Sequence, residues 1–282
     1  MNISNSNPFL KVKDYSVSGE VFDLIYDTEY DMLITHPQPS LEKLPSYYES
    51  EDYISHTDGN KSLFEKMYQF VKGIALKNKL KLINSESQKA RILDIGAGVG
   101  DFLSVCKNDG WETIGIEPSE KARNIAKSKG VSFVENLSEL EDNSFDIISM
   151  WHVLEHVPDL KHQIKELKRL LKPKGTIIIA VPNFKSFDAK YYGKFWAAFD
   201  VPIHLWHFSK TAIQKLFAEE NLDLAKVLPM KFDSFYVSLL SEKYKTGKMN
   251  FFKAFFIGCK SNYYGFKNKE YSSHIYIIKQ KN

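Results

Sequence analysis

The stretch that decides the fold is "RILDIGAGVGDF", which spans Arg91 to Phe102. A short apolar run opens it, and three glycines, Gly96, Gly98 and Gly100, follow at once. Glycines at such a turn let a ligand lie directly against backbone amides, because no side chain intervenes. The stretch therefore predicts a buried strand, a ligand-binding loop and the start of a helix, and it suggests an adenosine-type cofactor.

Short β-type runs alternate with helical segments on the carboxyl side of this stretch. This alternation is typical of a parallel sheet with helices on both faces. We expect an α/β fold with a Rossmann-like, seven-stranded, mostly parallel sheet, and helices near 62–82, 101–110, 118–130, 159–172 and 209–220. The strands are expected at 91–95, 113–117, 131–135, 145–150, 175–181, 225–231 and 272–280.

The composition sets limits on the class of protein. The chain has 282 residues and a formal net charge of +3, too small to argue for nucleic acid or an anionic membrane as an obligatory partner. Two isolated cysteines exclude a disulfide framework and fit a reducing cytoplasm. The most apolar C-terminal stretch, "NFFKAFFIGCK", is short and interrupted by Lys253 and Gly258, so it predicts a core helix and no membrane anchor.

Two segments stand outside the alternating pattern. Residues 1–60 are rich in Tyr, Asp, Ser and Pro and are expected to form an accessory arm before a main domain at 61–282. The aromatic, aperiodic segment at 183–208 follows the fifth strand and is a candidate substrate lid. Its candidate substrate residues are Trp196, His204 and His207, with a satellite aromatic core as the alternative.

Two carboxylates lie in register with the glycine loop. Asp94 falls inside the end of an apolar strand, where an unpaired carboxylate is costly to bury. Glu117 ends the second strand about 20 residues beyond the loop, where an acid can accept hydrogen bonds from two ribose hydroxyls. Both positions support a nucleoside-containing cofactor.

The segment "WHVLEHVPD" contains His152, Glu155 and His156 in the order H-x-x-E-H, which some zinc proteases use. Such a site needs both histidines on one sustained helix. Pro158 and the helix-capping Asp159 leave no room for that helix. The segment instead follows the fourth strand, at the sheet edge where open α/β sheets bind ligands.

These motifs resemble the class I S-adenosylmethionine-dependent methyltransferases. "LDIGAGVGDF" is similar to the first motif of that family, "IGIEP" to its second-strand acid, and "VLEHVPD" to its motif after the fourth strand. The resemblance covers 91–183 and implies S-adenosylmethionine as cofactor, with S-adenosylhomocysteine as product. It implies that the cofactor contacts Asp94, Gly96, Ala97, Gly98, Gly100, Phe102, Glu117, Pro118, Asn136, Leu137, Trp151 and His152.

The ubiquinone-pathway O-methyltransferases carry Glu-x-x-Glu-His after this strand, sometimes with a divalent metal, whereas the first position here is His152. Because a hard cation prefers oxygen ligands, we expect no metal. His152 and His156 are candidate bases for methyl transfer to an O, N or C nucleophile of a small molecule. A structural role for this turn, an NAD(P)-dependent oxidoreductase and a catalytically inactive binding module with the same fold are the alternatives.

Overall fold

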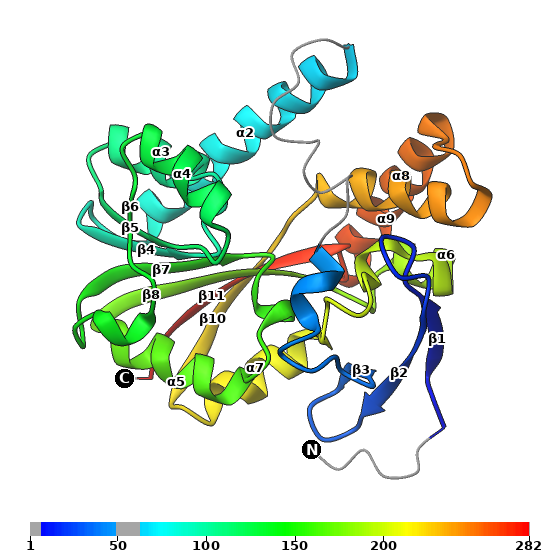
Figure 1. Cartoon of the computed structure of the whole chain (residues 1–282), viewed down its shortest axis with the longest axis horizontal. Helices are drawn as coiled ribbons and strands as arrows, with labels where there is room; N and C mark the ends of the chain where they lie inside the picture. The colour runs from blue at the N-terminus through cyan, green and yellow to red at the C-terminus, as the bar shows by residue number, and fades with distance from the viewer. Residues whose placement is uncertain (1–6, 49–62, 282) are drawn as a thin grey trace.

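The computed structural model describes residues 7–48 and 63–281, and it contains two sheets (Figure 1). The larger sheet has seven strands in the order β10-β11-β8-β7-β4-β5-β6, with β11 antiparallel to both neighbours. The predicted α/β fold with a mostly parallel seven-stranded sheet is therefore confirmed. The strands of this sheet are β4 (Arg91–Ile95), β5 (Glu112–Ile116), β6 (Ser132–Phe133), β7 (Phe145–Trp151), β8 (Leu171–Pro182), β10 (Leu222–Pro229) and β11 (Ser273–Gln280).

Helices cover both faces of this sheet, with α2, α3 and α4 on one face and α5 and α7 on the other (Figure 1). Neighbouring strand residues point to opposite faces, so Ile92 packs in the cluster under α2–α4, while Leu93 packs in the cluster with α5 and α7. The helices are α2 (Leu63–Glu86), α3 (Asp101–Asn108), α4 (Glu120–Ser128), α5 (Leu160–Leu170) and α7 (Lys210–Ala218).

The strand bounds differ from the prediction by more than one residue in β6, β8 and β10, and β10 begins at Leu222, three residues before the expected start. β6 is only Ser132–Phe133, because this edge strand pairs with β5 through two residues alone. β8 begins at Leu171, four residues before the expected start, since Leu171 already pairs with Phe145 across a bulge in the β7–β8 ladder.

The second sheet is antiparallel and joins distant parts of the chain. Its order is β1-β2-β3-β9, and β9 comes from the 183–208 segment. That segment was expected to be aperiodic, but it also contains α6 (Phe187–Tyr192) and two short 3₁₀ turns. The strands are β1 (Leu10–Lys13), β2 (Val21–Asp27), β3 (Met32–His36) and β9 (Trp206–His207).

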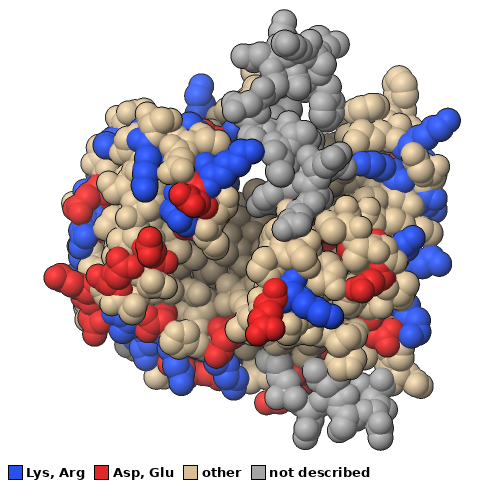
Figure 2. All heavy atoms as spheres, viewed as in Figure 1, with Lys and Arg blue, Asp and Glu red and all other residues tan. Residues whose placement is uncertain are grey.

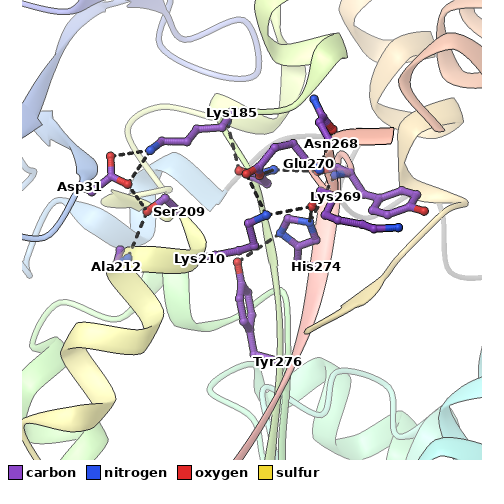
Figure 3. A network of polar contacts seen from close by, with 12 residues as sticks. Asp31, Lys185, Ser209, Lys210, Ala212, Asn268, Lys269, Glu270, His274 and Tyr276 are labelled. Carbon is purple, nitrogen blue, oxygen red and sulfur yellow. Dashed lines mark hydrogen bonds and ion pairs between the residues drawn. The ribbon is translucent and has the colours of Figure 1, made fainter. Parts of the chain in front are cut away.

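A polar network ties the two sheets together (Figure 3). Asp31, in the turn between β2 and β3, accepts a hydrogen bond of 2.6 Å from Lys185 Nζ and one of 3.0 Å from Ser209 Oγ. Burial raises the pKa of Asp31, but Lys185, Tyr26 and Ser209 outweigh burial and hold it below the usual range. Ser209 also caps α7 through the amide of Ala212, so one carboxylate fixes the start of this helix.

Two helices, α8 (Asp233–Thr246) and α9 (Phe251–Asn268), lie between β10 and β11 in the chain. The predicted helix at 250–260 is confirmed as part of α9, but its expected place in the core is wrong, because Phe252, Phe255 and Phe256 are exposed. Small residues occupy the buried face of α9, so its large rings are left outside. No helix among the described residues is long and apolar enough to span a membrane.

Candidate functional site

The glycine loop after β4 and the acid after β5 meet at the carboxyl edge of the sheet. Gly98 has a φ of 53°, and a Cβ at this position would meet no atom within 4 Å. The Gly98 amide donates to Glu117 Oε2 at 2.9 Å, and the Ser119 amide donates to Glu117 Oε1 at 2.9 Å. The structure thus brings the predicted loop and the predicted acid into contact beside open space.

Gly96 places this loop against the turn that follows β7. Its φ is 73°, and a Cβ here would lie 2.4 Å from Val153 Cγ2. Only glycine allows this approach. The glycine loop and the histidine-bearing turn at 152–156 are consequently neighbours.

Asp94 is buried at the end of β4, as the sequence suggested. Its exposed fraction is 3%, and Ser149 Oγ of β7 donates to it at 2.5 Å. Burial raises the pKa of Asp94 to about 7, although Ser149 and the nearby Lys79 oppose the rise. A cationic or hydrogen-bond-donating group bound at the loop would therefore lower the pKa of Asp94 and favour its charged form.

Lys79 is a site residue that sequence analysis missed. It comes from α2, and its Nζ lies 4.2 Å from the centroid of the Trp151 ring and 5.7 Å from that of Phe102. Burial lowers the pKa of Lys79, while Asp94 and Asp233 oppose the decrease. The helical pattern at 62–82 gave no reason to prefer Lys79 over the other lysines of α2.

Trp151 and Phe102 pack edge to face, with ring centroids 5.6 Å apart. The indole Nε1 of Trp151 is buried and donates no hydrogen bond to any described residue. A buried donor without an acceptor is costly, and a bound ligand with an oxygen or nitrogen acceptor relieves that cost.

The predicted adenine residues lie beside a pocket of about 540 Å³. Asn136 and Leu137 line it together with Ile95 and Ile116, the last residues of β4 and β5. The remaining predicted cofactor positions are Ala97 and Gly100, which follow β4, and Pro118, which follows β5. Figure 2 shows a hollow between the two halves of this face of the molecule.

His152 lies between two acids. Its Nε2 is 3.0 Å from Asp233 Oδ2, and its Nδ1 is 3.5 Å from Glu155 Oε1. Burial lowers the pKa of His152, but Asp233 and Glu155 outweigh burial and raise it to about 10. An imidazolium at neutral pH has no lone pair to accept a proton, so this geometry favours His156 over His152 as a base.

Glu155, His156 and His204 form a cluster whose ligand atoms lie within 4.8 Å of one another. His156 Nδ1 is 3.0 Å from the carbonyl oxygen of Ile203, and His204 Nδ1 is 2.9 Å from that of Ala198. A carbonyl oxygen only accepts, so each Nδ1 carries the proton and each Nε2 keeps a lone pair. Burial lowers the pKa of His156 to about 4 and also lowers that of His204, which keeps both rings neutral.

Glu155 completes this cluster as a buried charge. It is 1% exposed, and neither of its side-chain oxygens accepts a hydrogen bond from any described residue. Burial raises its pKa, yet the positively charged His152 is the largest opposing influence, and the pKa of Glu155 is lowered. Two neutral Nε2 atoms and one carboxylate fit the nitrogen-rich donor set of a zinc-like divalent cation.

Trp196 and His207, the other two candidate substrate residues, are not members of this cluster, although the ring centroids of His207 and His204 are 6.4 Å apart. Trp196 is 1% exposed and donates to Asp188 Oδ2 at 2.8 Å, so it belongs to the core around α6. His207 Nε2 lies 3.0 Å from Thr35 Oγ1, and burial holds its pKa well below the usual range. Of the three candidates, His204 alone joins the cluster with Glu155 and His156 of the turn at 152–156.

The family comparison gives the class of protein. A methyltransferase domain family matches residues 65–227, more than half of the chain. The chain therefore belongs to the methyltransferase domain family, as a class I S-adenosylmethionine-dependent enzyme with S-adenosylmethionine as its cofactor. The open space beside Gly98 leaves room for this cofactor, and the unpaired Trp151 Nε1 offers it a hydrogen-bond donor.

The most similar curated proteins include two methyltransferases of quinone biosynthesis. Ubiquinone biosynthesis O-methyltransferase of Actinobacillus pleuropneumoniae is 34% identical over 107 residues, covering 33% of this chain and 46% of that protein. Demethylmenaquinone methyltransferase of Staphylococcus aureus is 32% identical over 120 residues, covering 36% of this chain and 49% of that protein. The chain thus spans about half the length of the curated relatives it matches.

Solved structures show the same fold. Magnesium protoporphyrin IX methyltransferase from Synechocystis with bound S-adenosylhomocysteine matches with a TM-score of 0.56 and 14% identity, covering 85% of this chain and all of that one. A possible histamine N-methyltransferase from Thermotoga maritima matches with a TM-score of 0.52 and 23% identity, covering 77% and 94%.

Proposed function

We propose that the chain transfers the methyl group of S-adenosylmethionine to a hydroxyl oxygen of a small aromatic molecule of the quinol type. One observation carries the proposal: Gly96 packs against Val153, so the cofactor loop lies directly beside the Glu155, His156 and His204 cluster. Methyl transfer needs the donor and the acceptor held in line, and a base when the acceptor must lose a proton.

The cluster supplies that base at a defined atom. His156 Nε2 accepts the hydroxyl proton, because Nδ1 is committed to Ile203 and burial keeps the ring neutral. Glu155 then stabilises the imidazolium that forms. A phenolic hydroxyl has an ordinary pKa near 10, far above that of His156, so the proton leaves as the oxygen receives the methyl group and becomes acidic. The names of the two curated relatives point to quinone-type substrates.

The cofactor side of the site follows from the same contacts. In this proposal Glu117 binds the ribose hydroxyls, and Asp94 orients the methionine part of the cofactor. Lys79 lies on the same side as Asp94 and pairs with the methionine carboxylate. The packed rings of Trp151 and Phe102 form the side of the site next to Lys79.

A second candidate role for the cluster is cation binding. The side-chain oxygens of Glu155 accept no hydrogen bond from any described residue, although His152 Nδ1 lies 3.5 Å from Oε1, and both neighbouring Nε2 lone pairs are available. A bound divalent ion would lower the pKa of the acceptor hydroxyl. The residues that would hold it are Glu155, His156 and His204, without His152.

The test has two stages. Calorimetric titration with S-adenosylmethionine and S-adenosylhomocysteine, with NAD as control, is expected to show saturable binding of the first two alone. Radiolabelled methyl transfer is then measured on a panel of catechols and hydroquinones, against anilines and thiols of similar size. Binding of NAD alone would indicate the oxidoreductase, and labelling of nitrogen or sulfur acceptors alone would overturn the O-methyl proposal.

A further inference from the structure

We propose that the exposed face of α9 docks the protein on the surface of an anionic lipid membrane. This face is inverted relative to an ordinary surface helix, which buries its large apolar side chains. In α9 the buried residues are Ile257 and four small ones, Ala254, Gly258, Ser261 and Gly265. The exposed side carries large rings, namely Phe252, Phe255, Phe256, Tyr263 and Phe266.

These rings form one continuous surface. At 3.6 residues per turn they fall within an arc of roughly 100°. Phe252 is 92% exposed, Phe266 69% and Phe255 63%. Large exposed apolar patches mark interaction surfaces, because single exposed rings are common but a full helix face of them is not.

The charge beside the rings identifies the occupant. The α9 sequence "FFKAFFIGCKSNYYGFKN" contains no Asp or Glu. Lys260 Nζ lies 4.9 Å from the Phe256 ring centroid, and Lys267 Nζ lies 4.5 Å from that of Tyr263, so cations border the aromatic arc. A helix with rings on one side and lysines at the border is the pattern of an interfacial helix on anionic lipid. A second copy of the chain is a poorer occupant, because its own Lys260 and Lys267 would face those of the first copy and like charges repel.

The position of the helix pair fits a membrane-soluble substrate, although the docking proposal does not depend on methyl transfer. β11 follows α9 and begins at the carboxyl end of β8, where Ser273 pairs with Pro182. At the other end of the pair, Asp233 of α8 binds His152 of the candidate site. Docking through α9 would hold the carboxyl edge of the sheet near the lipid.

The chain provides its own reporter for a test. Cys259 is exposed within the aromatic arc, whereas Cys106 is buried. A nitrobenzoxadiazole label on Cys259 of the full chain is mixed with vesicles of phosphatidylcholine, or of phosphatidylcholine with phosphatidylglycerol. We expect a blue shift and quenching by brominated acyl chains with the anionic vesicles, and unlabelled protein is expected to sediment with them.

Matched variants separate the two components of binding. Phe252→Ser with Phe256→Ser is expected to weaken vesicle binding roughly 100-fold, about tenfold for each ring. Lys260→Gln with Lys267→Gln is expected to weaken binding to anionic vesicles by about 30-fold. The control is Phe70→Ser with Leu41→Ser, which removes two side chains that are each 70% exposed elsewhere, and its binding is expected to stay unchanged.

Three results would overturn the proposal. They are failure of the unlabelled wild-type chain to sediment with anionic vesicles, equal loss in the control variant, and self-association through α9 in sedimentation velocity without vesicle binding. Thermal unfolding checks that each variant is folded. If the Phe252→Ser, Phe256→Ser variant does not fold, quenching of the labelled wild-type chain by brominated acyl chains tests the docking instead. Cofactor binding is measured separately, so failure of docking leaves the proposed methyl transfer intact.

Discussion

His152 Nε2 lies 3.0 Å from Asp233 Oδ2, and this contact joins the turn after β7 to the first residue of α8. His152 adopts a φ of 58°, which is strained for a residue with a Cβ. The ion pair holds the strained turn in place, and the same turn carries Glu155 and His156. The pair is therefore a positioning device for the cluster.

Asp233→Asn is expected to lower the free energy of unfolding by roughly 1–2 kcal/mol at neutral pH, because His152 is partly exposed and solvent screens the pair. The folded pKa of His152, about 10, lies above its ordinary value, so the contribution is full below about pH 6.5 and lost as the pH rises through 10. Chemical unfolding at pH 7 and pH 10 measures the change. Asp223→Asn, at an exposed position of β10, is the control; an equal effect there would contradict the assignment.

Asp94→Asn is expected to stabilise the cofactor-free protein while weakening cofactor binding. Burial raises the pKa of Asp94 from 3.8 to about 7, so the charged carboxylate destabilises the fold at pH 8 by up to roughly 4 kcal/mol. Asp94 is protonated in the folded state below its raised pKa, so the advantage of the variant shrinks as the pH falls from 7 towards 4. Melting temperatures measured between pH 4 and pH 8 test the change in stability, and calorimetric titration with the cofactor tests the change in binding. A variant less stable than wild type at pH 8 would refute the prediction.

Lys79→Met is expected to weaken binding of S-adenosylhomocysteine roughly 10- to 100-fold, the usual effect of losing a charge-assisted contact. Binding of 5′-methylthioadenosine, which lacks the carboxylate, is expected to change little. Lys77→Met removes an exposed lysine from the same helix and serves as control. Equal losses for both ligands would show that Lys79 supports the fold of the site instead.

The Glu155, His156 and His204 cluster is expected to bind Co²⁺ with visible d–d absorption typical of low coordination number, and Zn²⁺ is expected to displace it. His204→Ala is expected to weaken binding by at least about tenfold. His162→Ala, on α5, is the control. Absence of Co²⁺ absorption, with activity unaffected by chelators, would leave His156 as the base.

Local sequence was enough to predict the strands of the large sheet, because buried apolar runs between glycine turns are a local signal. Arg91–Ile95 was predicted to the residue. Lys79 was missed because its role depends on how α2 lies across Trp151, which helical periodicity does not encode. The exposed face of α9 was missed because apolar composition alone does not say which side of a helix is covered.

The meeting of His204 with Glu155 and His156 was also beyond local pattern. It depends on backbone pairing, since the Leu205 amide donates to the Glu155 carbonyl oxygen at 2.8 Å. The sequence marked both segments as candidates separately. Only the folded chain shows that they form one cluster.

The pairing of β3 with β9 has a consequence for synthesis of the chain. β3 is complete at His36, but its partner strand begins at Trp206. At ~5–20 residues per second, the roughly 170 intervening residues take on the order of 10–30 s to emerge. During that interval the nascent β1–β3 meander has an open edge, a state in which chaperones or neighbouring nascent chains can pair with it.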